Sequence, residues 1–456
     1  MASQSQASRY RWIVLLLIFL SYMIAGADRA NIGVVVPFMK KEFELSNTDI
    51  GAMASLFYLG YAFIQVPVGL LYEKFGVRRI FTFAMVATSL STMFLGFAHS
   101  ALQLKIGRVL LGLAEGPINV GILTVINRWF PPHEKATAVG VFMSSIKFAP
   151  AVVPPLCAFI IYTFGWREVF YIFALPGLFI AAIWFFCVSD DPRRSRFANA
   201  QEVAYIESTA VTDGSAPTDG VKTRAGWPIL DRLIMAREIQ PLADNVAILR
   251  SWNVWGCALG YGFIVGVAYA IMTWVPTYLI NVKHYPLFQM GFVAATPWVG
   301  AIIGNLIGGV LSDRLFDKRR KPVMILTAAS TVLMMYALIY SPGDPFLLAG
   351  LFIATGILLN LGYSTFLVYP MGLVAKDKVP LASAIVNTVG SLGGAFAPFV
   401  VGMILDRYSW DMVFLFLAAS SLATLALVLT IIEPIALFRQ APSAPVTEVP
   451  RTEPIA

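Results

Sequence analysis

Residues 69–79 read GLLYEKFGVRR, and a related stretch, GVLSDR, occurs 240 positions later at residues 309–314. Each stretch places a glycine, a leucine and an acidic–basic pair at the same spacing. A second pair, GWREVF at 165–170 and SWDMVF at 409–414, is separated by 244 positions. Two repeats at nearly one offset indicate two related halves, an arrangement that favours a binding site between them.

Long apolar segments surround these repeats. The chain is 58% hydrophobic and 13% charged, whereas a soluble domain is typically about 25% charged. We predict an all-α membrane protein with twelve spans of about 20 residues, the length that crosses a hydrocarbon core of ~30 Å, in two six-helix bundles. The predicted spans are 12–36, 50–72, 80–98, 101–127, 137–163, 168–189, 252–280, 288–312, 322–340, 345–370, 381–405 and 411–432.

The spans divide the chain into four regions. We predict an N-terminal bundle at 1–189, a cytoplasmic linker with one or two surface helices at 190–251, and a C-terminal bundle at 252–433. The Pro-rich, polar residues 434–456 are predicted to form a disordered cytoplasmic tail. We expect this chain to be a monomer.

Basic residues predict the orientation of the spans. With both termini in the cytoplasm, 24 of the 33 lysines and arginines lie in cytoplasmic segments, five lie in outer loops and four lie within spans. Such a bias follows the positive-inside rule. The same distribution argues against nucleic-acid binding, because the basic residues gather in loops between spans. We expect a multi-pass protein of the bacterial inner membrane.

Six charged residues interrupt the apolar segments. A charge at the centre of a bilayer costs about 3 kcal/mol on insertion scales, and such residues are retained mainly where they bind or move something charged. These residues predict a membrane transporter for an anionic solute, with protons as the coupling ion. They are the bases Arg29, Lys105, Arg108 and Lys147 and the acids Asp28 and Glu115.

The spacing of these residues suggests how they divide the work. Asp28 and Arg29 are adjacent, so they lie about 100° apart on a helix and cannot face one point. Either Arg29 faces the cavity while Asp28 takes a proton, or the two only hold helices together. Arg108 and Glu115 are seven residues apart, almost on one face and about 10 Å apart along the axis. Glu115 is either a proton site or the partner of Arg108 in a structural salt bridge.

The repeated stretches resemble a known family. Residues 69–79 are similar to the loop signature of the major facilitator superfamily, and residues 108–116 (RVLLGLAEG) resemble its second signature. The Gly-Pro-rich antiporter signature is absent from the fifth span, which reads KFAP at 147–150. By analogy with the family, this favours symport over drug export.

Four further motifs resemble the anion:cation symporter branch, and within it the bacterial sugar-acid carriers of the galactonate, glucarate and hexuronate type. They are DRAN at 28–31, GLAEG at 112–116, GWR at 165–167 and WVPTYL at 274–279. The resemblance implies that Asp28 and Glu115 couple protons, that Arg29 binds a substrate carboxylate, and that Arg108 is the ion-pair partner of an acid.

Other residues complete the predicted site. The resemblance implies substrate contacts for Tyr61 and Asn387, and Ser364 is a candidate for binding substrate hydroxyls. Lys147 departs from the pattern, because small or amide residues are ordinary at its position. It binds the substrate, at the far carboxylate of a diacid or at a second polar patch, or it neutralises Glu115, or it extends to the interface.

Charges at the cytoplasmic helix ends form the predicted gate. We expect them to pair while the carrier is open to the outside and to separate when it opens inward. The residues are Glu73, Arg78, Arg79, Asp313 and Arg314.

The sequence therefore predicts a proton-coupled symporter that imports a small organic anion, a sugar acid such as an aldonate, aldarate or hexuronate, by alternating access. The alternatives are a carrier of a tartrate- or phthalate-like dicarboxylate or aromatic acid, and a non-transporting membrane sensor. The chain shows no nucleophile–base pair and no metal-ligand spacing, so we expect no enzyme activity and no cofactor.

Overall fold

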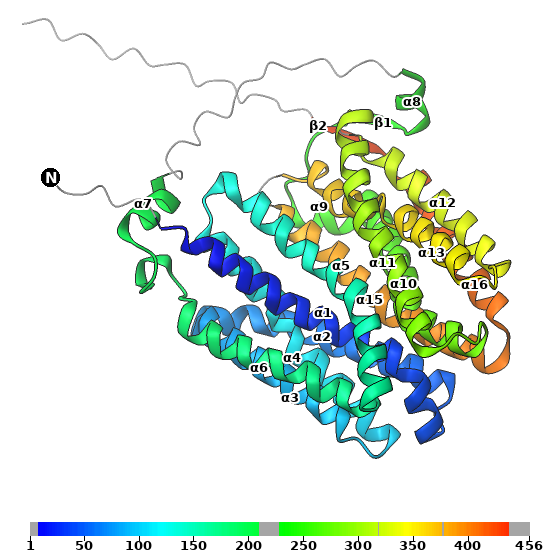
Figure 1. Cartoon of the computed structure of the whole chain (residues 1–456). Coiled ribbons are helices and arrows are strands. Elements are labelled where there is room, and N and C mark those ends of the chain that lie inside the picture. The colour runs from blue at the N-terminus through cyan, green and yellow to red at the C-terminus, as the bar shows by residue number, and fades with distance from the viewer. Residues whose placement is uncertain (1–7, 209–227, 318, 376–377, 437–456) are drawn as a thin grey trace, which may run out of the picture.

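The apolar segments form long helices in the computed structural model, which describes residues 8–208, 228–317, 319–375 and 378–436. Six helices make up the first bundle (Figure 1). They are α1 (Tyr10–Phe43), α2 (Asn47–Phe75), α3 (Val77–Gly96), α4 (Ala101–Trp129), α5 (Pro132–Thr163) and α6 (Trp166–Cys187).

The second bundle repeats this plan with one helix divided. Its elements are α10 (Trp252–Asn281), α11 (Leu287–Val310), α12 (Lys321–Ile339), α13 (Pro345–Asn360), α14 (Tyr363–Val368), α15 (Val379–Arg407) and α16 (Trp410–Thr430). Among the described residues, eleven helical segments are long and apolar enough to cross a membrane. Helix α2, with 29 residues, is a further long helix of the first bundle. The predicted all-α architecture with twelve spans agrees with this arrangement.

Local sequence fixes where several helices begin. At the start of α2, the Ser46 hydroxyl accepts the backbone N–H of Asp49 while the Asp49 carboxylate accepts that of Ser46, which is a capping box. Asp344 accepts the backbone N–H groups of Phe346 and Leu347 at the start of α13. These side chains satisfy amide groups that have no partner within the first turn of a helix.

The tenth predicted span is not one continuous helix. Helix α13 ends at Asn360, α14 begins at Tyr363, and a 3₁₀ turn, η3 (Tyr369–Gly372), follows. The neighbouring α11 packs its backbone directly against the break, because a Cβ atom at Gly308 would overlap the carbonyl oxygen of Leu361. The close approach of α11 therefore coincides with the interruption, which the apolar pattern alone does not reveal. Helix α11 itself ends in a short π-helical turn, η2 (Leu311–Leu315).

The two bundles contact each other on the side opposite to the start of α1, which we call the far side (Figure 1). There the Asp406 carboxylate, near the end of α15, accepts the backbone N–H groups of Asn47 and Thr48 at the start of α2, both at 2.8 Å. Further along the same helices, the Ser55 hydroxyl donates to the carbonyl of Ala395. Helices α2 and α15 thus join the halves on the far side.

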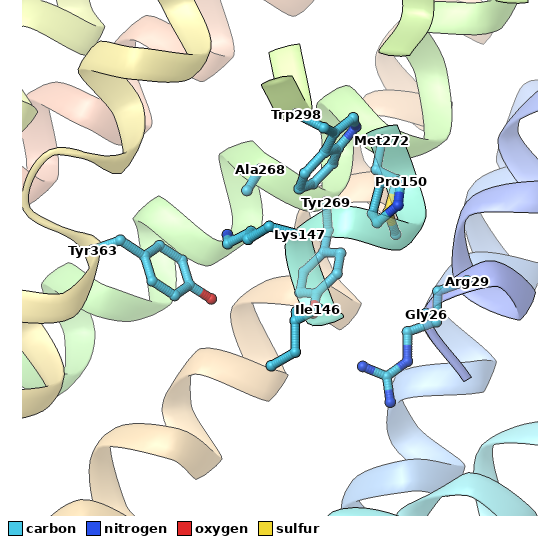
Figure 2. A pocket seen from close by; sticks show the side chains of 10 residues that line it. All are labelled: Gly26, Arg29, Ile146, Lys147, Pro150, Ala268, Tyr269, Met272, Trp298 and Tyr363. Carbon is cyan, nitrogen blue, oxygen red and sulfur yellow. The ribbon is translucent and has the colours of Figure 1, made fainter. Parts of the chain in front are cut away.

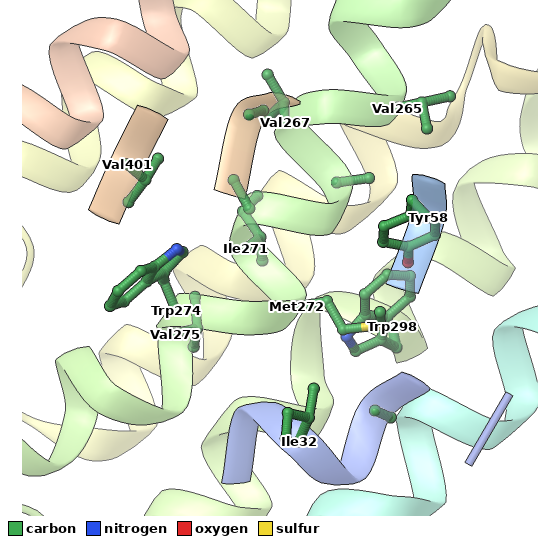
Figure 3. Close-up of a cluster of buried hydrophobic side chains, with 14 of the residues drawn as sticks. Ile32, Tyr58, Val265, Val267, Ile271, Met272, Trp274, Val275, Trp298 and Val401 are labelled. Carbon is green, nitrogen blue, oxygen red and sulfur yellow. The ribbon is translucent and has the colours of Figure 1, made fainter. Parts of the chain in front are cut away.

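Apolar packing continues across the interface toward the middle of the molecule. The buried cluster in Figure 3 combines Ile32 and Tyr58 of the first bundle with Met272, Trp274 and Trp298 of the second. A single buried core therefore spans both bundles at their interface.

The predicted linker is attached to both bundles by short elements. A 3₁₀ turn, η1 (Pro192–Arg194), and α7 (Ala200–Ser208) follow the first bundle, and α8 (Pro228–Leu233), β1 (Ala236–Ile239) and α9 (Asn245–Arg250) precede the second. Glu202 of α7 is buried, and its carboxylate accepts the backbone N–H groups of Tyr10 at 3.1 Å and Arg11 at 3.0 Å. This carboxylate caps the positive end of α1.

Part of the predicted disordered tail is a strand, so that prediction was wrong for residues 434–436. Strand β2 (Glu433–Ala436) pairs in parallel with β1, with Ala236 opposite Glu433. The Glu433 carboxylate also accepts the backbone N–H groups of Arg320 at 3.0 Å and Lys321 at 2.7 Å. The linker supplies the pairing partner that composition cannot show. The predicted tail from residue 437 to 456 lies outside the described residues.

The break between α13 and α14 yields a first prediction. Gly308→Ala should lower the unfolding free energy by about 1–3 kcal/mol, because the added methyl group must displace backbone atoms. Gly309→Ala is the matched control, since no atom lies within 4 Å of its Cβ position and alanine favours helices by about 1 kcal/mol over glycine. Unfolding of the purified protein in detergent measures both, and equal stability of the two variants would contradict the close approach.

Candidate binding site

A pocket lies between the two bundles and takes side chains from five helices (Figure 2). It encloses about 410 Å³ of space that protein atoms do not fill, part of it open to solvent. Two of its lining residues are basic and, among the described residues, none is acidic. The lining residues are Gly26, Arg29, Ile146, Lys147, Pro150, Ala268, Tyr269, Met272, Trp298 and Tyr363. The pocket is therefore suited to an anion.

Arg29 of α1 forms a buried ion pair with Glu115 of α4. The distance between Arg29 Nε and Glu115 Oε2 is 2.9 Å, and the Glu115 side chain is fully buried. The contact leaves capacity unused, because Arg29 Nη2 and Glu115 Oε1 are buried without hydrogen-bond partners. A bidentate pair would fill both groups, so Arg29 retains a donor for another acceptor.

Aromatic rings surround the Arg29 guanidinium. Its central carbon lies 5.0 Å from the ring centre of Tyr61, 5.4 Å from that of Tyr22 and 5.6 Å from that of Phe57. Rings at this distance attract a cation through their negative faces. They hold the guanidinium in place without neutralising it, which preserves its attraction for an anion.

Arg108 does not form the predicted ion pair. Among the described residues, no carboxylate oxygen lies within 4.0 Å of its nitrogens; they donate to the backbone carbonyls of Met53 at 3.3 Å and Asp28 at 3.4 Å. Its guanidinium carbon also lies 4.7 Å from the centre of the Phe57 ring. Glu115 is instead bound by Arg29, because α1 reaches the acid across the helix interface while Arg108 lies two turns away on α4 itself.

Asp28 and Arg29 point to different surroundings, as the predicted division of the pair requires. Arg29 lines the pocket, whereas Asp28 does not and is 1% exposed. Within the described part of the chain, no basic nitrogen lies within 4.0 Å of the Asp28 carboxylate. Its polar neighbour is Asn31, whose side-chain amide donates to Asp28 Oδ1 at 3.4 Å. Asp28 is thus a buried acid without a close counter-ion.

Lys147 of α5 is the second base of the pocket. Its Nζ donates to Asn360 Oδ1 at 3.0 Å and lies 4.0 Å from the centre of the Tyr363 ring and 5.6 Å from that of Trp298. The residue is 8% exposed, and no described acid lies within 4.0 Å of Nζ. Two of the three interpretations of Lys147 therefore fail here, because it neither pairs with Glu115 nor extends to an interface.

The other predicted substrate contacts are placed unequally. Tyr61 is buried beside Arg29, and its hydroxyl accepts from the amide of Asn119 at 3.2 Å. Asn387 and Ser364 are not among the residues that line the pocket; Asn387 is exposed and donates to the carbonyl of Ser383 on its own helix. Asn119 was missed, although it follows Glu115 by four residues and so shares its helix face.

Four of the five predicted gate residues have described side chains, and these four, Arg78, Arg79, Asp313 and Arg314, do not pair with one another. Asp313 pairs instead with Arg320 of its own bundle at 2.6 Å, and Arg79 and Arg314 are exposed. The side chain of Glu73 lies outside the described part.

Arg78, the remaining gate residue, is held within its own bundle. Its guanidinium carbon lies 4.5 Å from the centre of the Phe185 ring, and its backbone N–H donates to Asp190 at 2.7 Å.

Comparison with known proteins now assigns the family. A profile of the Major Facilitator Superfamily matches residues 18–318 and 288–454. The chain belongs to the major facilitator superfamily. It is therefore a multi-pass membrane protein of a transporter family, in agreement with the prediction that it is not an enzyme.

Two similar proteins are carriers of sugar acids by their names. The chain is 27% identical over 441 residues to the probable galactarate/D-glucarate transporter GarP of Escherichia coli (strain K12), which covers 92% of this chain and 94% of that protein. It is 27% identical over 430 residues to the D-galactonate transporter of Escherichia coli O6:H1 (strain CFT073), with the same two coverages.

Solved structures share the fold. A bacterial homolog of the human lysosomal transporter Spinster, in its inward-facing and occupied conformation, superposes with a TM-score of 0.70 at 16% sequence identity. The similarity covers 93% of this chain and 95% of that one.

Within the described residues of this chain, no group of three or more His, Cys, Asp and Glu side chains is arranged to hold a metal ion.

The Phe57 ring, which lies close to the guanidinium groups of both Arg29 and Arg108, yields a second prediction. Phe57→Leu should lower the unfolding free energy by about 1–2 kcal/mol more than Phe170→Leu, because the ring contacts two buried guanidinium groups. Phe170 is equally buried and loses the same volume, so it is the matched control. Unfolding of both variants in detergent gives the difference, and an equal loss would show that ring–cation attraction contributes nothing.

Proposed function

We propose that this protein imports a small organic anion, a sugar acid, together with protons across the bacterial inner membrane. The observation that carries the proposal is the ion pair of Arg29 and Glu115 at the edge of a basic pocket. The names of the similar carriers, which include galactarate, D-glucarate and D-galactonate, support the choice of sugar acids.

The ion pair links substrate binding to proton binding. A substrate carboxylate that binds Arg29 competes with the Glu115 carboxylate for the same guanidinium. A proton on Glu115 removes this competition and frees Arg29 for the substrate. Since each event favours the other, the affinities for proton and substrate rise together, as reciprocal linkage requires.

Asp28 supplies a second proton site in this proposal. It is buried, lies next to Arg29 in the chain and has no described basic partner within 4.0 Å. An isolated buried carboxylate is costly while it is charged. Protonation removes that cost, so Asp28 is suited to carry a proton through the membrane.

Proton coupling also supplies work for uptake. Each elementary charge that crosses the membrane changes the free energy by about 2.3 kcal/mol per 100 mV. An anion that enters alone is repelled by a negative interior. Cotransport of protons removes this penalty and draws on the proton gradient.

The arrangement of contacts fits one state of an alternating-access cycle. If both termini lie in the cytoplasm, as the basic residues predict, the Asp406 contacts with Asn47 and Thr48 close the outer side. The gate residues then lie on the cytoplasmic side. The lack of pairing among the four whose side chains are described is the condition expected of an inward-open carrier. Their role as a latch in the outward-open state belongs to the same proposal.

An aromatic acid is the second candidate substrate. The pocket is lined by the rings of Tyr269, Trp298 and Tyr363, and among the described residues no serine, threonine or asparagine lines it. Such walls suit a planar ring. Stabilisation of the purified protein against heat by phthalate, but not by D-galactonate or galactarate, would favour this candidate over a sugar acid.

The coupling proposal yields a third prediction, measured on protein reconstituted in vesicles with an imposed pH gradient. Asp28→Asn and Glu115→Gln should each abolish uphill accumulation of D-galactonate, because a neutral amide cannot exchange a proton, while counterflow of substrate continues. Glu207→Gln is the control, since Glu207 pairs with exposed Arg193 outside the pocket. Normal accumulation by both acid variants would overturn the proton assignment.

The role of Arg29 is tested in the same vesicles. Arg29→Ala should abolish both accumulation and counterflow, since loss of a buried charged contact costs about 2–5 kcal/mol in binding. Counterflow that persists at the normal rate would show that another group binds the substrate carboxylate.

A vesicle population that shows no flux of any acid with the unaltered protein would favour a sensor over a carrier.

A further inference from the structure

Lys147 is a buried cation whose hydrogen-bond partner is a neutral amide. Its Nζ donates to Asn360 Oδ1 at 3.0 Å, and no described carboxylate lies within 4.0 Å. A buried charge without a counter-ion is costly, and charged residues within spans face partners or cavities. The pocket onto which Lys147 opens is the place from which a counter-ion can come.

The ammonium group retains unused donors. A lysine has three N–H donors, and Asn360 takes one of them. The amide of Asn360 is itself fixed, because its Nδ2 donates to the carbonyl of Gly356 at 2.9 Å, which turns Oδ1 toward Lys147. Lys147 is thus held in place with donors available for a further acceptor.

Two cations of different helices line the same pocket. Arg29 comes from α1 and Lys147 from α5, and in Figure 2 the Lys147 side chain extends toward Tyr363 while Arg29 lies on the other side of the view. Glu115 is paired with Arg29, whereas no described acid lies within 4.0 Å of Lys147 Nζ. An anion with one carboxylate satisfies one of these groups and leaves the other unmatched.

The surroundings of Lys147 belong to the interrupted span. Asn360 is the last residue of α13 and Tyr363 the first of α14, so Lys147 of the first bundle contacts both sides of the break in the second. Discontinuous helices near the middle of the bilayer commonly form the binding sites of transporters. A ligand group at Lys147 therefore touches both halves at once.

We propose that Lys147, Asn360 and Tyr363 form a second anion subsite, and that the substrate is a sugar diacid with a carboxylate at each end. One carboxylate binds Arg29 and the other binds Lys147. The proposal rests on the function proposed above and adds the class of acid. Both cations belong to the first bundle, so the diacid meets the second bundle at Asn360 and Tyr363, on either side of the break between α13 and α14.

A matched pair of ligands tests the subsite. Galactarate and D-galactonate share a six-carbon skeleton and differ at one end, where the first has a carboxylate and the second a hydroxymethyl group. Lys147→Gln should weaken galactarate binding tenfold or more, the loss expected for a hydrogen bond to a charged group, and change D-galactonate binding less than threefold. Retained D-galactonate binding also shows that the variant is folded.

A second variant tests the same subsite by filling it instead of removing its charge. Asn360→Asp places a carboxylate where the amide oxygen now accepts from Lys147, so it occupies the subsite from within. Galactarate binding should again fall tenfold or more, while D-galactonate binding persists. Lys105→Gln is the control, because Lys105 pairs with Asp49 at 2.6 Å away from the pocket, and both affinities should be unchanged.

The outcomes separate the two proposals. Equal losses for both ligands in Lys147→Gln, or unchanged galactarate binding in both variants, would overturn the subsite while leaving acid transport intact. Failure of the unaltered protein to bind either ligand would overturn both the sugar-acid function and the diacid subsite. Binding of D-galactonate in preference to galactarate by the unaltered protein would overturn the diacid class alone.

Discussion

The buried contact between Arg29 and Glu115 is the interaction on which this account depends. It joins α1 to α4 within an apolar bundle, where each charge needs the other. The same contact is incomplete, since one nitrogen and one oxygen of the pair have no partner. A pair that is needed in the empty carrier, yet leaves a donor unused, is suited to exchange one carboxylate for another.

The second bundle provides the other side of the site at the break between α13 and α14. Close packing of α11 against the backbone at Leu361 accompanies the break between α13 and α14, and the break brings Asn360 and Tyr363 to Lys147. Lys147 on the first bundle and the helix break on the second therefore belong to one arrangement. In the proposed diacid complex, these contacts connect the occupancy of the pocket to the relative position of the halves.

Much of this site was visible in the sequence, because charges stand out in apolar spans. Arg29 and Glu115 were found in this way, and the repeated stretches indicated the two bundles that the structure contains. The sequence did not predict the partner of Glu115 correctly. Spacing along one helix favoured Arg108, whereas contact between helices is decided by their packing. The sequence also did not indicate Asn360, because its position depends on packing between helices. Asn360 ends α13 where Gly308 of α11, far away in the chain, approaches the backbone.

The central claim is that a substrate carboxylate replaces Glu115 at Arg29 as Glu115 takes up a proton. Calorimetric titration of the purified protein with galactarate, in two buffers of different ionisation enthalpy, measures protons exchanged on binding. Net proton uptake is expected with the unaltered protein, and a smaller uptake with Glu115→Gln. Binding with no proton uptake in the unaltered protein, at any pH between about 5 and 8, the range in which protein stability is usually greatest, would contradict this exchange.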